Sequence, residues 1–167
     1  MNLHAPLKSQ YHAGLKTLRA VIESIPEAQW LLPGDGGAPY WRVIYHTLFY
    51  THFYLHQKQE AFTPWSRHQP EANYIASVGH ENHRPPLPCE PYTQADLLEY
   101  WTQVNDSVDS AIDALDLSAP QCGFPWYPVS TLEHQLVNLR HIQHHAAILS
   151  HRLRQEAGIE ISWVSKG

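Results

Sequence analysis

Hydrophobic residues recur at helical spacing in two separate parts of the chain. The first stripe is formed by residues separated by steps of four and three: Leu3, Leu7, Tyr11, Leu15, Leu18, Ile22 and Ile25. The second stripe has the same spacing: Leu97, Trp101, Val104, Val108, Ala111 and Leu115. Because an α-helix has about 3.6 residues per turn, each stripe covers one face of a helix. The pattern predicts helices over about Ala5–Ile25 and Gln94–Leu115.

Two other segments also have helical character. Residues Tyr40–Glu60 are apolar on nearly every side, which is typical of a helix buried on several faces. Residues Thr131–Ala157 contain no helix breaker, and Ser130-Thr-Leu-Glu133 before them reads as a capping box. Gly158 suits the end of that helix, and Thr93-Gln-Ala-Asp96 suits the start of the preceding one. We therefore predict four helices of about 20 residues.

The segments between these helices are rich in proline and glycine. They cover residues 27–39, 63–92 and 116–129, and no strand pattern of any strength occurs in the chain. The connection between the second and third helices is about 30 residues long, which is too long for a tight antiparallel turn. The sequence predicts an all-α protein: one domain over residues 1–167, folded as a four-helix bundle with a long crossover connection between helices 2 and 3.

Composition narrows the range of functions. Hydrophobic residues make up 43% of the chain and charged residues 16%, as expected of a globular domain. The formal charge is -5 with scattered lysines and arginines, which argues against nucleic-acid binding. No apolar run is long enough for a membrane span and no signal peptide is evident, so a cytoplasmic location is expected. Cys89 and Cys122 form no CxxC pair, and Cys122 fits an incidental loop thiol better than a nucleophile.

The most informative chemical pattern is His141-Ile-Gln-His-His145. His141 and His145 lie about 40° apart on a helical wheel, a spacing with which one helix offers two imidazoles to one metal ion. The wheel places both at the edge of the apolar face, and it places His144 and His151 away from them. Because the chain has 13 histidines, a histidine-rich surface helix is the simple alternative.

His46 lies within the second, strongly apolar helix. A buried histidine needs a polar partner. A lone one is more often a core residue bonded to a carbonyl, but a metal shared with His141 and His145 would also satisfy it. Tyr50 and Phe53 share the face of His46 and are expected to wall a pocket.

His52 and His56 form a rival pair four residues apart. The helical wheel turns both away from His46, so we expect them toward solvent or the end of the helix. We expect the loops that carry Trp65, Trp126 and Tyr127 to cover the pocket.

The sequence does not contain two other metal-binding motifs in full. A ferritin-like di-iron site needs Glu-x-x-His on two helices, and the sequence contains none. His80-Glu-Asn-His83 is one residue short of the HExxH motif and lies in a proline-rich loop.

Two segments resemble the signature segments of the DinB-like (YfiT-like) metalloenzymes. They are Trp41-Arg-Val-Ile-Tyr-His46-Thr-Leu-Phe-Tyr50 and Asn138-Leu-Arg-His141-Ile-Gln-His-His145. The resemblance implies a four-helix bundle with a long crossover. It also implies a site in which His46, His141 and His145 bind a divalent metal, usually zinc or nickel, with the fourth position open to water. Members of the family often form homodimers.

The resemblance also implies a chemistry. Some relatives transfer a low-molecular-weight thiol to an electrophilic small molecule, so we expect a metal-dependent thiol S-transferase or hydrolase. Many relatives carry an acidic residue six positions after the first ligand, where this chain has His52, and this departure puts a supporting role at that position in doubt. The alternative is a non-catalytic, metal-stabilised bundle that acts as a dimerisation or small-molecule-binding module.

Overall fold

The computed structural model describes residues 3–34, 37–75 and 87–167, and within these residues every regular element is helical. The α-helices are α1 (His4–Ser24), α2 (Tyr40–Tyr54), α3 (Gln94–Ala114) and α4 (Thr131–Ala157), and short 3-10 helices cover Glu27–Gln29 and Gln59–Ala61. The predicted all-α class is confirmed. The His80–His83 segment lies outside the described residues.

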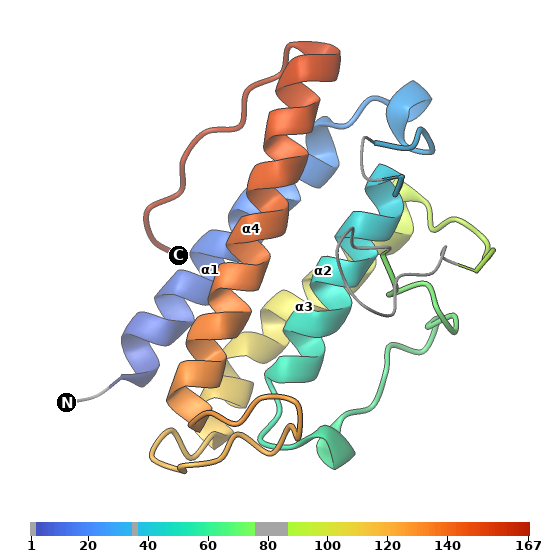
Figure 1. Cartoon of the computed structure of the whole chain (residues 1–167). Helices are drawn as coiled ribbons and strands as arrows, with labels where there is room; N and C mark the ends of the chain where they lie inside the picture. Colours follow the sequence, from blue (N-terminus) through green and yellow to red (C-terminus); the bar gives the residue numbers. More distant parts are fainter. Residues whose placement is uncertain (1–2, 35–36, 76–86) are drawn as a thin grey trace.

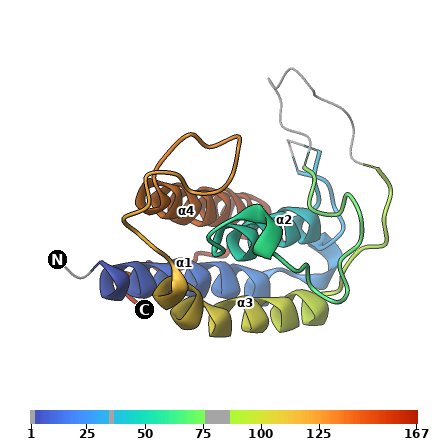
Figure 2. The ribbon, with the colours of Figure 1, turned by 90° about the horizontal axis from the view of Figure 1, so that it is seen from below.

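The four helices form a bundle of two layers. Figure 2 shows α4 and α2 side by side over α1 and α3. Each helix packs against two others: α1 and α2 both contact α3 and α4. In Figure 1, α2 and α3 run in the same direction, because the connection after α2 returns along the bundle before α3 begins. The predicted crossover is therefore confirmed.

Local signals set the ends of α3 and α4. Thr93 and Asp96 form a reciprocal capping box, with Asp96 N donating to Thr93 Oγ1 at 3.1 Å and Thr93 N donating to Asp96 Oδ2 at 2.9 Å. At the start of α4, Ser130 Oγ accepts from Glu133 N at 3.2 Å, which is the serine half of the predicted box. Gly158 ends α4 with φ 69°, a left-handed conformation that glycine adopts without steric cost.

Helix α2 ends at Tyr54, earlier than the predicted end at Glu60. Two side-chain amides of α4 bind carbonyls in its last turn. Asn138 Nδ2 donates to Thr51 O at 3.2 Å, and Gln135 Nε2 donates to Tyr54 O at 2.9 Å. Thr51 O also accepts from Leu55 N at 3.2 Å, so Tyr54 O is the carbonyl that a longer helix would bond internally and that α4 satisfies instead. The predicted end was too late because this donor comes from a different helix.

A buried arginine fixes the crossover to α2. Arg42 is only 5% exposed. Its Nη1 donates to the carbonyls of Glu71 and Tyr74, both at 3.3 Å, and its Nη2 donates to Leu87 O at 3.0 Å and contacts Cys89 Sγ at 2.9 Å. One guanidinium thus holds two separate stretches of the crossover against the helix that carries His46.

The described helices are not suited to crossing a membrane, since none combines sufficient length with sufficient hydropathy.

His134 on α4 is an unusual member of the core. It is 0% exposed, and its ring lies 4.7 Å from those of Tyr54 and Phe124 and 5.1 Å from that of Tyr127. Neither ring nitrogen has a hydrogen-bond partner among the residues that the structure describes. Burial lowers the pKa of His134 to about 4, so the ring is neutral at physiological pH.

We predict that His134→Phe stabilises the fold. The change removes unpaired buried nitrogens from an aromatic environment, so the free energy of unfolding at pH 7 should rise by about 1 kcal/mol. In the unfolded chain histidine has a pKa of about 6.5, so the unfolded state alone takes up a proton as the pH falls from about 6.5 to about 4. The variant should therefore lose less stability than the wild type across that window.

Urea unfolding at a series of pH values measures both effects. His151→Phe, an exposed position on the same helix, is the matched control and should leave the profile unchanged. A variant less stable than the wild type at pH 7 would show that the His134 ring has a partner that stabilises it.

Candidate metal centre

Three histidines meet where α2 packs against α4. His46 comes from α2, and His141 and His145 come from successive turns of α4. One ring nitrogen from each lies within 4.8 Å of the others. His46 Nε2 is 3.0 Å from His141 Nε2. The structure thus brings together the three residues that the sequence singled out, although their role as metal ligands stays a prediction.

The arrangement fits a divalent metal ion. Zinc binds imidazole nitrogen at about 2.0–2.1 Å, so two ligands of a tetrahedral ion lie about 3.3 Å apart. The nitrogens of His46 and His141 are close to that separation. His141 Nδ1 has no hydrogen-bond partner in the described part of the chain, so its Nε2 makes the ring's polar contact. An ion between the rings would give both lone pairs a common partner.

A backbone carbonyl orients the first ring. His46 Nδ1 lies 2.7 Å from Asn73 O, which can only accept, so Nδ1 carries the proton and Nε2 presents its lone pair. Metal-binding histidines commonly donate their second nitrogen in this way, which fixes ring orientation and raises basicity. The side-chain amide of Asn73 also donates to Tyr50 Oη at 3.4 Å, which places this part of the crossover against α2.

All three rings are neutral at physiological pH. Burial is the main cause that lowers the pKa of His46 to about 4, of His141 to about 3 and of His145 to about 2, and neighbouring histidines contribute to each of these shifts. A cluster of imidazoles cannot accept several protons at close range because like charges repel. Neutral imidazole is the form that binds a metal, so the site is ready for an ion without first losing protons.

Aromatic side chains wall one side of the centre. The ring of Tyr50 lies 4.8 Å from that of His46 and 5.9 Å from that of His141, as expected from its place on the helix face. Phe53 was expected to share this face; its ring lies 6.4 Å from that of Tyr50, but it packs closer to Phe62 at 4.8 Å and Phe124 at 5.0 Å, about two turns of α2 beyond His46.

The three loop aromatics occupy different places. Trp65 was expected over the pocket but is 3% exposed and stacks on Tyr100 at 4.8 Å, inside the core. Trp126 is 52% exposed and packs beside Phe53. Only Tyr127 borders a hollow that also contains His141. The indole of Trp65 buries more apolar surface inside the bundle than it would over a polar site, which accounts for its position in the core.

The rival histidine pair faces another helix. His52 was expected toward solvent or the end of the helix; it lies in the last turn of α2 and is 9% exposed, with its Nδ1 3.3 Å from the hydroxyl of Tyr100 on α3. His52 and His56 both line a hollow between α2 and α3, whereas the three-histidine cluster lies between α2 and α4. His52 therefore has no position from which to support His46. His144 and His151 are exposed, and neither belongs to the three-histidine cluster, as the helical wheel indicated.

The two cysteines are free thiols outside the cluster. Cys122 is 1% exposed and donates to Tyr127 O at 3.2 Å, which agrees with a buried loop thiol. Cys89 is half-buried and receives a hydrogen bond from Arg42. Burial raises the pKa of Cys89 even though Arg42 acts in the opposite direction, so its protonated form is favoured.

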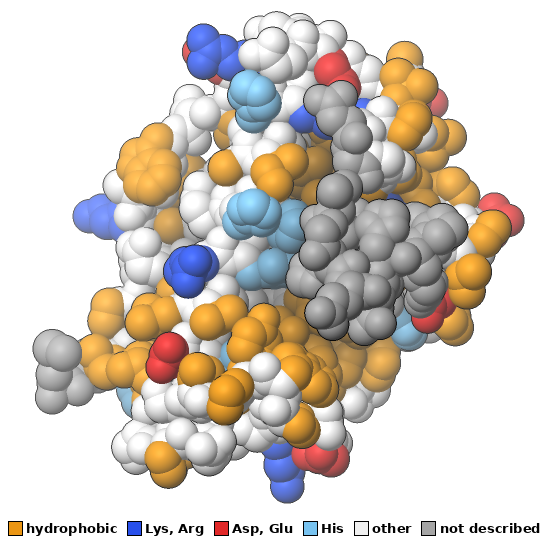
Figure 3. All heavy atoms as spheres, in the orientation of Figure 1, with side chains coloured by type: hydrophobic (Ala, Val, Ile, Leu, Met, Phe, Trp, Pro, Cys, Tyr) orange, Lys and Arg blue, Asp and Glu red, His pale blue; other side chains and the backbone are white. Residues whose placement is uncertain are grey.

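A cavity of about 770 Å³ opens beside the histidines, and His144 and His145 line one end of it. On the face shown in Figure 3, histidine side chains gather along α4. Of the three cluster rings, that of His145 borders this cavity, and that of His141 borders a separate hollow beside Tyr127. This leaves room for a further ligand next to the cluster.

A family model of the DinB superfamily matches residues 10–149, a range that contains all three histidines. The chain belongs to the DinB superfamily. No curated protein and no solved structure matches it in two further comparisons. The family resemblance seen in the two signature segments is thus confirmed over most of the chain of this DinB protein.

Sequence reasoning missed three residues that contribute to the site. The carbonyl of Asn73 could not be found, because every residue has a carbonyl and only the fold selects this one. Arg152 and Glu156 of the cavity did leave a signal, because they follow His145 by seven and eleven residues on the same α4 face.

We expect His46→Ala, His141→Ala and His145→Ala each to reduce bound metal to a small fraction of the wild-type content. Elemental analysis of protein purified without chelator or affinity metal gives the stoichiometry. His144→Ala is the matched control, because His144 is exposed and adjacent to His145. Undiminished metal in the His46 and His141 variants would rule out the site.

Proposed function

We propose that this DinB protein is a metal-dependent enzyme that activates a low-molecular-weight thiol for transfer to an electrophilic small molecule. The observation that supports the proposal is a cluster of three neutral histidines, one of which, His145, borders a cavity. Three protein ligands with one open position is the pattern of catalytic zinc, whereas structural sites use four. The choice of a thiol rests on the chemistry of some relatives. Hydrolysis by an activated water is the closest variant.

We further propose zinc or nickel as the metal, held by His46, His141 and His145. Imidazole nitrogen suits both ions. A divalent ion in such a site favours the thiolate form of a bound thiol, which supplies a nucleophile near neutral pH. The homodimer that the family resemblance implies and a cytoplasmic location belong to the same proposal.

The protein's own residues prepare the site in three ways. Asn73 O holds the proton of His46 at Nδ1, so that the Nε2 lone pair faces the cluster. The Tyr50 ring covers two of the imidazoles and excludes water from that side. Burial raises the pKa of Tyr50, so its hydroxyl keeps its proton. The cavity beside His145 offers a thiol and its acceptor room to meet, and a second hollow borders His141.

We expect metal-loaded protein to accelerate the reaction of a thiol with an electrophile such as 1-chloro-2,4-dinitrobenzene or monobromobimane. Removal of the metal by a chelator and the His145→Ala substitution should each reduce the rate at least a hundredfold, because both remove the site that stabilises the thiolate. Product absorbance or fluorescence, corrected for the uncatalysed rate, measures the effect across several small thiols.

The same samples test the non-catalytic alternative. If chelation lowers the unfolding temperature while no thiol reacts faster with any electrophile, the metal serves the bundle's stability and the enzymatic proposal is wrong.

A further inference from the structure

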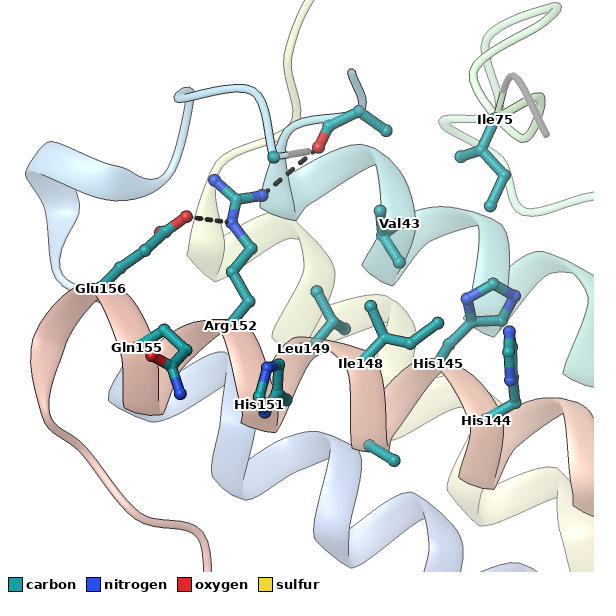
Figure 4. Close-up of a pocket in the computed structure, with 13 residues that line it drawn as sticks. Val43, Ile75, His144, His145, Ile148, Leu149, His151, Arg152, Gln155 and Glu156 are labelled. Carbon is teal, nitrogen blue, oxygen red and sulfur yellow. Dashed lines mark hydrogen bonds and ion pairs between the residues drawn. The ribbon is translucent and has the colours of Figure 1, made fainter. Parts of the chain in front are cut away.

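The cavity beside the histidines follows one face of α4. Arg152 and Glu156 each lie about 20° from His145 on the helical wheel, on opposite sides of it, with Ile148 and Leu149 in the turn between His145 and Arg152. Figure 4 shows these side chains bordering the same space. At 1.5 Å per residue, His145 and Arg152 are about 10 Å apart along the helix. The cavity is therefore elongated, with the histidines at one end and the Arg152–Glu156 pair at the other.

The middle of the cavity is apolar. Ile148 and Leu149 line it from α4, and Val43 of α2 and Ile75 of the crossover line the opposite side (Figure 4). Ile148 is 46% exposed, although it shares the helix face of buried residues. An apolar section between two polar ends suits a ligand with a hydrocarbon or similarly apolar body.

The far end is a fixed polar site with balanced charge. The Arg152 side chain is 12% exposed, and its Nε donates to Glu156 Oε1 at 2.7 Å. Its Nη2 donates to Leu32 O at 2.9 Å and its Nη1 donates to Ala38 O at 3.3 Å. The guanidinium also stacks 3.8 Å from the ring of Tyr40. These contacts hold the guanidinium in place before any ligand arrives.

This end can still form hydrogen bonds with a ligand. A guanidinium has five N–H donors, and the contacts to Glu156, Leu32 and Ala38 use three of them. Gln155, which also lines the cavity, adds a donor and an acceptor. A bare anion would meet the carboxylate of Glu156 as well as the guanidinium, and a purely apolar end would leave the two remaining N–H groups of Arg152 and the amide of Gln155 desolvated without a ligand partner.

We propose that this cavity binds the substrate thiol of the reaction, and that the thiol is an elongated molecule with a polar head group of no net charge. Its sulfur lies at the histidine end, its apolar body lies over Ile148, and its head group meets Arg152 and Gln155 about 10 Å away. A primary amide, which both donates and accepts, is the simplest such group. The inference rests on the proposed thiol chemistry and adds the length and the head group that the site selects.

A series of synthetic thiols bound to cobalt-loaded protein tests the inference without turnover. The ω-mercapto amides, carboxylates and alkanes of increasing chain length are titrated, and the thiolate-to-cobalt charge-transfer absorbance reports binding. We expect affinity to peak for the amide whose sulfur-to-head distance is about 10 Å, at least tenfold tighter than a two-carbon thiol. The carboxylate and the alkane of the same length should bind more weakly than the amide.

Two substitutions locate the binding region. Ile148→Trp fills the middle of the cavity at an exposed position, so it should remove the advantage of the long amide while the two-carbon thiol still binds. Leu136→Trp, at an equally exposed position elsewhere on α4, is the matched control and should change neither. Arg152→Gln should abolish the preference for the amide. If that variant does not fold, Ile148→Trp still decides the outcome.

The outcomes separate the inference from the proposed function. Affinity that is independent of chain length and head group, or unaffected by Ile148→Trp, would overturn the inference and leave thiol activation standing. A tighter complex with the carboxylate than with the amide would overturn the assigned head group. If no thiol produces the charge-transfer band, the proposed function is wrong and the inference is wrong with it.

Discussion

The antiparallel packing of α2 against α4 is the constraint on which the rest of this DinB protein depends. Gln135 and Asn138 of α4 donate to the carbonyls of Tyr54 and Thr51, and these bonds set the register of the two helices. Tyr11 of α1 donates to Gln135 Oε1 at 2.6 Å and so fixes which way that amide faces. Because each buried amide would be costly to leave unpaired, sliding of the helices is opposed. This register places His46 opposite the pair on α4.

The long crossover connects α2 to α3, and it also helps to build the candidate metal centre. It returns the chain along the bundle so that α2 and α3 run the same way, and it brings Asn73 O to the ring of His46. The buried guanidinium of Arg42 holds the carbonyls on either side of that position. The crossover has no regular secondary structure here, but it takes a defined conformation because the buried guanidinium of Arg42 needs its carbonyls as hydrogen-bond acceptors.

Much of the fold could be predicted from the sequence, because helical periodicity and capping are local. The stripes that begin at Leu3 and Leu97, the box at Thr93 and the stop at Gly158 all agree with the structure. The predictions that differ from the structure concern positions whose conformation or burial depends on contacts with another helix. Helix α2 ends at Tyr54, where α4 supplies a donor to the last carbonyl, and His52 lies near the helix end as one alternative had it, but it is buried against Tyr100 of α3 and does not face solvent. A helical wheel gives the direction in which a side chain leaves its own helix. It does not show which neighbouring element lies in that direction.

The sequence by itself determined the helices, the face on which His141 and His145 lie, and the resemblance of two segments to a family. Only the tertiary structure decided that His46 meets that pair, that Asn73 sets its proton, and that Arg152 and Glu156 form the far end of the same cavity. The reason is physical. Spacing along one helix is set by its 3.6-residue turn, whereas the distance between atoms on different elements is set by packing and by the partners that buried polar groups require.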